Sequence, residues 1–194
     1  MAAQHVPWIS PEEFLEHEEA SRTKHSYTAG IVTAMAGGSS EHAVLAMNLG
    51  SELRSALRGR GCRVVGSDLL FQTGSKEMYT YPDAMVVCGP FARMEGRLSV
   101  ITNVITNPVF VAEVLSPSSE GFDRGAKSRE YRASPTLMQY ALLSQERPLI
   151  ELHTRDDDGT WRISEVSGLE GECEFTSLHC RIPMAALYEG VRDA

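Results

Sequence analysis

Residues 81–88 read Tyr-Pro-Asp-Ala-Met-Val-Val-Cys, and residues 107–117 read Asn-Pro-Val-Phe-Val-Ala-Glu-Val-Leu-Ser-Pro. Both segments are rich in valine, which is typical of buried, neighbouring β-strands. Each segment also carries one carboxylate, Asp83 in the first and Glu113 in the second. A carboxylate in an apolar strand is costly unless a cation meets it, and hard divalent cations prefer oxygen ligands. The two segments therefore predict a divalent metal site between adjacent strands.

The composition is that of an ordinary globular protein. The chain has 194 residues, of which 42% are hydrophobic and 23% charged, so we expect a single domain over residues 1–194. No apolar run approaches the roughly 20 residues of a membrane span, and the N-terminus lacks the pattern of a signal peptide. The four cysteines have no zinc-type spacing, which favours a cytoplasmic protein. We expect Cys88, at the end of an apolar run, to be a buried thiol.

The net charge of −8 disfavours tight, non-specific binding to a long DNA duplex, because such proteins are usually basic. It does not exclude a nuclease whose acidic site is neutralised by bound metal. The chain also lacks a glycine-rich phosphate loop that would indicate a nucleotide cofactor.

The expected elements alternate in a way that indicates a mixed α/β sheet flanked by helices, an α+β arrangement. Ser10 and Pro11 predict a helix start within residues 8–20, and a turn at Ala29-Gly30 predicts a hairpin. Ser39 or Ser40 caps a long helix that ends at residues 59–61. We further expect strands at 62–73, 79–87, 109–115, 137–143, 149–154 and 161–166, helices at 123–133 and 183–190, a loop at 91–106, and a turn at 156–159.

Pro82-Asp83 followed by Glu113-Val114-Leu115 resembles the signature of the PD-(D/E)XK nuclease superfamily. A longer series of motifs resembles the Uma-two family of restriction-endonuclease-like proteins within that superfamily, and this resemblance covers nearly the whole chain. It implies a restriction-endonuclease-like core with a central mixed β-sheet flanked by helices, preceded by an N-terminal helix and hairpin. The series comprises Tyr27-Thr28-Ala29-Gly30, Met35-Ala36-Gly37, the helix with His42, Tyr81-Pro82-Asp83, Glu113 to Ser118, Asp123 to Lys127, Tyr131, and Leu187 to Gly190.

The resemblance implies a metal-dependent endonuclease that hydrolyses DNA phosphodiester bonds. Asp83, Glu113 and the backbone carbonyl of Val114 would bind Mg²⁺ or Mn²⁺, and a lysine would orient the attacking water. DNA would be the partner, and we expect a homo-oligomer, specifically a homodimer. The candidates for accessory roles in this site are His42, Asp123, Arg124 and Tyr131.

The chain departs from the superfamily pattern at two places. Position 115 is Leu115 instead of lysine, and the resemblance offers Lys127 as the substitute. Related chains carry acidic residues near the hairpin, where this chain has Ser26 and Ala29. The loss of a metal ligand there would weaken metal binding and would put catalysis, but not the fold, in question.

Each candidate residue also has a purely structural interpretation. Asp83 could be an exposed turn carboxylate, and Glu113 could form a buried salt bridge to an arginine or to Lys127. Asp123 and Lys127, four residues apart, could pair on a solvated helix start, and His42 could be a half-buried, hydrogen-bonded histidine. The alternative function is then a catalytically degenerate nuclease fold that acts as a binding or oligomeric module. Zinc is not expected, because the remaining candidates lack ligand spacing: His25, His153 and His179.

Overall fold

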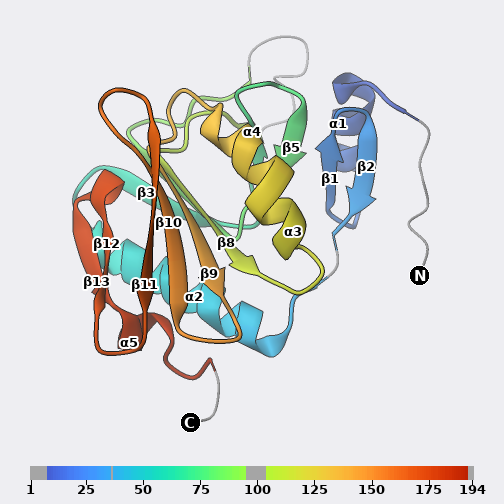
Figure 1. The fold of residues 1–194 in the computed structure, drawn as a ribbon. Coiled ribbons are helices and arrows are strands. Elements are labelled where there is room, and N and C mark those ends of the chain that lie inside the picture. The colour runs from blue at the N-terminus through green and yellow to red at the C-terminus, as the bar shows by residue number, and fades with distance from the viewer. Residues whose placement is uncertain (1–7, 36, 95–103, 192–194) are drawn as a thin grey trace.

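A six-stranded mixed sheet forms the centre of the molecule (Figure 1). The computed structural model describes residues 8–35, 37–94 and 104–191. β8 and β9 are parallel, whereas the other neighbouring strands are antiparallel, so the predicted mixed α+β architecture is confirmed. In spatial order the strands are β11 (Trp161–Ser167), β10 (Leu149–Arg155), β9 (Gln139–Ser144), β8 (Phe110–Leu115), β6 (Ala84–Cys88) and β3 (Cys62–Gly66).

The N-terminal helix α1 (Pro11–Ala20) packs on a second, five-stranded sheet. The helix begins as predicted, because Ser10 and Glu13 exchange side-chain hydrogen bonds with each other's backbone N–H groups. The hairpin also turns where predicted, with positive φ angles at Ala29 and Gly30. In spatial order the strands are β2 (Ile31–Ala34), β1 (His25–Thr28), β5 (Met78–Thr80), β4 (Leu70–Gln72) and β7 (Val104–Ile105).

Helices cover both faces of the six-stranded sheet. On one face lie α2 (Ser40–Ala56), which Ser39 caps, and the short α5 (Met184–Leu187). Leu45, Leu49 and Leu53 recur every four residues along α2, and all three are fully buried on this face. On the other face, α3 (Glu120–Phe122), a π-helical turn (Asp123–Lys127) and α4 (Ser128–Arg132) follow one another without a break. Burial of each large apolar side chain stabilises the fold by about 1.5–3 kcal/mol.

The prediction of one strand over residues 79–87 was wrong in a way that matters for the site. The segment forms two strands, β5 and β6, that belong to different sheets. Pro82 has no N–H to donate to a strand ladder, so the chain leaves one sheet at Thr80 and enters the other at Ala84. This crossing leaves Asp83 at the entrance of β6.

Three other expectations need adjustment. The loop expected over residues 91–106 includes the short strand β7, while residues 95–103 of it lie outside the described parts of the chain. The helix expected from Asp123 begins at Glu120, because the turn at Ser116–Ser119 leads directly into it. A hairpin near the C-terminus was not predicted: β12 (Glu172–Phe175) and β13 (Cys180–Pro183), joined through a 3₁₀ turn (Thr176–Leu178).

The expectation that Cys88 is a buried thiol was also wrong. Cys62 and Cys88 face each other in the β3–β6 register and form a disulfide, and Cys88 is exposed at the strand end. Cys173 and Cys180 are free thiols. None of the helices in the described parts of the chain has the length and apolar character needed to cross a membrane.

Candidate active site

The pairing of β6 with β8 brings Asp83 and Glu113 to the same end of two neighbouring strands. The antiparallel register ends with the pair Ala84–Ala112, so Asp83 directly precedes this pair on one strand and Glu113 directly follows it on the other. The Asp83 carboxylate is close enough to Glu113 to raise its pKa. The two segments that suggested a metal site therefore form adjacent strands, and both carboxylates lie at the same end of this strand pair.

Asp83 is held by two groups from different elements. The backbone N–H of Val114 donates a hydrogen bond of 2.7 Å to Oδ2, and Nε2 of His42 lies 3.1 Å from Oδ1. The Asp83 side chain is only 17% exposed, so the interpretation as an exposed turn carboxylate was wrong. Burial raises the pKa of Asp83, while the Val114 N–H and the His42 ring act in the opposite direction.

Lys127 connects Glu113 to the helical segment above the sheet. Its Nζ lies 2.9 Å from Oε1 of Glu113 and 3.0 Å from Oδ1 of Asp123, and the hydroxyl of Tyr131 donates a 2.6 Å hydrogen bond to the same Glu113 oxygen. All four side chains are buried. The buried salt bridge considered for Glu113 therefore exists, and its partner is Lys127. The π-helical turn, a local feature that often marks functional sites, contains both Asp123 and Lys127.

Burial and the neighbouring charges determine the protonation states of Glu113, Lys127 and Tyr131. It raises the pKa of Glu113 to about 8; Lys127 opposes the rise, whereas Asp83 and Asp123 add to it. Burial alone would lower the pKa of Lys127, but the Glu113 and Asp123 carboxylates raise it overall, so Lys127 is an ammonium donor and not a base. The pKa of Tyr131 is raised by burial and by Glu113, which keeps its hydroxyl protonated as a donor.

The donor set suits a divalent cation with oxygen ligands. Two buried carboxylates (Glu113 and Asp123) share one ammonium group and Asp83 lies nearby, so acidic groups outnumber the lysine. The carbonyl of Val114 projects to the same strand edge as its N–H, which already contacts Asp83. Three side-chain ligand atoms of the His, Cys, Asp or Glu type do not lie within 4.8 Å of one another at this site; in the described residues, such a group occurs elsewhere. The side-chain ligands that the two strands offer here are therefore two carboxylates.

The remaining predicted positions lie around this centre or away from it. Leu115 is buried in the apolar cluster around Tyr131 and supplies no charge. Arg124 pairs with Glu120 and Glu151, so it is not the cation that compensates Glu113. Ser26 belongs to β1 and faces Thr33 in the five-stranded sheet, so it is not on the strands that carry the two carboxylates.

Gly38 makes a close contact with His42 that the sequence analysis did not identify. A Cβ atom at Gly38 would stand 2.6 Å from Nδ1 of His42, so the absence of a side chain lets the imidazole lie against the backbone. Nδ1 of His42 is buried without a hydrogen-bond partner in the described structure, while Nε2 contacts Asp83. The Gly37-Gly38 pair, interpreted from sequence only as a break before the helix, therefore also fixes the position of His42.

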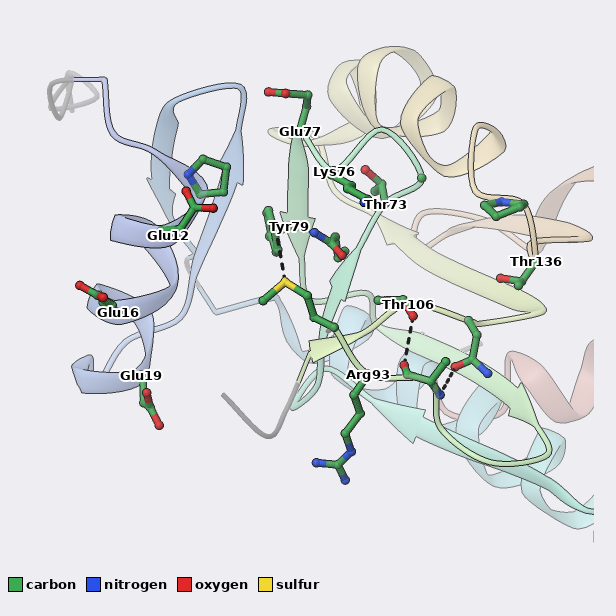
Figure 2. Close-up of a pocket in the computed structure, with 17 residues that line it drawn as sticks. Glu12, Glu16, Glu19, Thr73, Lys76, Glu77, Tyr79, Arg93, Thr106 and Thr136 are labelled. Atoms are coloured by element: carbon green, nitrogen blue, oxygen red, sulfur yellow. Dashed lines mark hydrogen bonds between the residues drawn. The ribbon is translucent and has the colours of Figure 1, made fainter. Parts of the chain in front are cut away.

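A wide cleft lies apart from this site. It has a volume of about 1260 Å³, and α1 contributes Glu12, Glu16 and Glu19 to its wall (Figure 2). Neither Asp83 nor Glu113 lines it. Acidic side chains outnumber basic ones along its walls, which disfavours a phosphate backbone in this cleft.

The mixed sheet flanked by helices is the fold of a restriction-endonuclease-like protein. A crystal structure described as that of "a putative nuclease belonging to DUF820" from Anabaena variabilis superposes with a TM-score of 0.76, covering 95% of this chain and 99% of the other at 16% identity. The model of the Uma2 family, "Putative restriction endonuclease", matches residues 11–180, and the chain belongs to this family.

Two relatives from Synechocystis sp. have no described function. The "Uncharacterized protein slr1290" is 38% identical over 185 residues, which is 95% of this chain and 94% of the relative. The "Uncharacterized protein sll1609" is 32% identical over 169 residues, which is 87% of this chain and 93% of the relative. The resemblance inferred from the sequence motifs is thus confirmed at the level of the family.

The substitution Glu113→Gln tests the raised pKa of Glu113. Between the ordinary pKa of 4.5 and the raised value of about 8, the native state retains a proton that the unfolded chain releases. The unfolding free energy of the wild type should therefore fall relative to Glu113→Gln as the pH rises from 5 to 8, by at most about 1.4 kcal/mol per pH unit. Urea unfolding at several pH values measures this difference.

The matched control is Glu174→Gln, which removes an exposed carboxylate paired with Arg181 and should leave the pH dependence as in the wild type. A difference between wild type and Glu113→Gln that does not change with pH would contradict the raised pKa. It would mean that Glu113 is ionised throughout this range beside Lys127.

Proposed function

We propose that this protein is a metal-dependent endonuclease that hydrolyses DNA phosphodiester bonds at the Asp83–Glu113 site. The observation that carries the proposal is the buried ammonium of Lys127, 2.9 Å from Glu113, on the strand whose Val114 N–H donates a hydrogen bond to Asp83. Membership of a family described as restriction endonucleases supports the same reaction class.

In this proposal Asp83, Glu113 and the Val114 carbonyl hold Mg²⁺ or Mn²⁺. The bound cation would supply Lewis-acid polarisation of the phosphate and activation of water. The three protein groups fix its position, because Asp83 is oriented by the Val114 N–H and Glu113 by the Tyr131 hydroxyl. Ligands that are oriented by outer hydrogen bonds need little reorganisation when an ion binds.

Lys127 would orient the attacking water and offset the negative charge that develops on the phosphate. The water oxygen forms a bond to phosphorus while the bond to the leaving sugar oxygen breaks; the water loses a proton, and the leaving oxygen gains one by exchange with solvent. Since Lys127 retains its proton, its role is that of a hydrogen-bond donor. Asp123 positions the ammonium from the π-helical turn, whereas Arg124 in the same turn is paired with Glu120 and Glu151.

The second candidate function is a degenerate nuclease fold that binds without cleaving. The observation in its favour is that Glu113, Lys127 and Asp123 already form a closed ion-pair set, which a fold could retain for structure alone. Ser26, in the other sheet, adds no acidic ligand. Metal-dependent cleavage separates the two functions.

The homodimer remains a prediction that oligomeric-state measurements would test.

The cleavage assay compares wild-type protein with two site variants on supercoiled, linear and single-stranded DNA, with Mg²⁺ or Mn²⁺ titrated. Asp83→Asn and Lys127→Arg should each lower the cleavage rate by at least on the order of a hundredfold. Asparagine weakens the metal ligand, and the wider guanidinium fork does not reproduce a compact ammonium.

Asp157→Asn, in the acidic hairpin tip, is the matched control and should cleave like the wild type. Equal rates for wild type and Asp83→Asn would assign any cleavage to another site or to a contaminant. No cleavage by any protein under any metal condition would favour the degenerate fold.

The adjacent glycines before α2 test whether His42 positions Asp83. Gly38→Ala forces the His42 ring to move, whereas a Cβ at Gly37 meets nothing within 4 Å. Mn²⁺ at a hundredfold excess over its Kd should stabilise the wild type and Gly37→Ala by about 2.7 kcal/mol, seen as a rise in Tm. Gly38→Ala should show a smaller rise at the same concentration. If Mn²⁺ raises the Tm of Gly37→Ala and Gly38→Ala by the same amount, His42 does not position Asp83 for metal binding.

A further inference from the structure

A second group of metal-ligating side chains lies where α1 meets β1, in the sheet that does not carry Asp83. His17 and Glu18 belong to the last turn of α1, and His25 begins β1. One ligand atom from each of the three lies within 4.8 Å of the others. The nuclease site does not use these residues, and the spacing along the sequence did not suggest them as ligands.

Glu18 and His25 are oriented by hydrogen bonds before any ion binds. Nδ1 of His25 lies 2.8 Å from Oε2 of Glu18. The hydroxyl of Tyr81 and the backbone N–H of His25 each donate a 2.9 Å hydrogen bond to Oε1 of Glu18. The Glu18 and His25 side chains are 6% and 14% exposed. The two hydrogen bonds to Oε1 are outer hydrogen bonds of the kind that fix the orientation of ligands in protein metal sites.

His17 is the member of the group that has no polar partner. Its ring approaches that of His25 edge-on, with centroids 5.2 Å apart, and across the described residues its side chain makes no hydrogen bond or ion pair. The residue is exposed, so an ion has access to the group from solvent. The group therefore combines two fixed ligands with one free imidazole at its open side.

We propose that His17, Glu18 and His25 bind a transition-metal dication of the zinc class. Two imidazoles and one carboxylate suit Zn²⁺, whereas Mg²⁺ prefers oxygen ligands alone. Three protein ligands leave a fourth tetrahedral position for water.

The ion would connect the end of α1 to the start of β1. Through the Glu18–Tyr81 hydrogen bond it would also connect both elements to the segment that leads to Asp83. This site does not depend on the nuclease proposal, because it shares no ligand with the Asp83–Glu113 site.

The test is a Zn²⁺ titration of the full chain in competition with a chromophoric chelator, in buffer with excess Mg²⁺. The wild type should bind one tight equivalent of Zn²⁺ that His17→Asn loses. His17 is exposed, so this variant leaves the core packing unchanged. His179→Asn removes another exposed histidine outside the group and should retain the equivalent.

Asp83→Asn, which disables the proposed nuclease site, should also retain the Zn²⁺ equivalent. Tyr81→Phe removes one hydrogen bond to Glu18 and should weaken Zn²⁺ binding by about tenfold or more. The proposal is overturned if the wild type binds no Zn²⁺ equivalent, or if His17→Asn retains it. An equivalent that disappears only in Asp83→Asn would assign the zinc to the other site and would equally overturn the proposal.

Discussion

The ammonium of Lys127 is the interaction on which the site depends. It lies between Glu113 and Asp123 at 2.9 and 3.0 Å, next to the strand end where the Val114 N–H donates a hydrogen bond to Asp83. A buried carboxyl group is costly unless a cation compensates it or it takes up a proton, and removal of one partner of a buried ion pair costs about 3–5 kcal/mol. The single ammonium leaves the cluster with more acidic groups than cations. Such an excess of buried carboxylates lowers the stability of the fold. In the proposed site, a bound divalent cation would neutralise the excess.

The topology explains how one lysine reaches both strands. β6 and β8 are neighbours in the central sheet, and the helical segment after β8 folds back over the same face, so Lys127 lies above Glu113. The lysine that related nucleases carry on the strand is here Leu115, which packs in the apolar cluster with Tyr131. The helix thus supplies the charge while the strand position contributes to the core. From the opposite face, α2 brings His42 to the end of β6, where it meets Asp83.

Features that depend on local chemistry were predictable from the sequence. The capping box at Ser10 and the hairpin turn at Ala29-Gly30 involve residues within four positions of one another, so their motifs specify them. The two valine-rich segments were predictable as neighbouring strands, because such segments are typical of buried sheets. The division of residues 79–87 between two sheets was not predictable from the sequence. It depends on which strands pair, and these strands are far apart in the sequence. The His17–His25 contact and the space that Gly38 leaves for His42 likewise exist only once the chain has folded.

The central claim is that the Asp83–Glu113 pair forms a cation site compensated by Lys127. Anomalous diffraction from crystals grown with Mn²⁺ tests it most directly, because the signal locates the ion independently of activity. We predict one Mn²⁺ peak bound by the Asp83 and Glu113 carboxylates and the Val114 carbonyl, and its absence in crystals of Asp83→Asn. Crystals of the wild type without a peak at these carboxylates, at Mn²⁺ concentrations that support cleavage, would contradict the account.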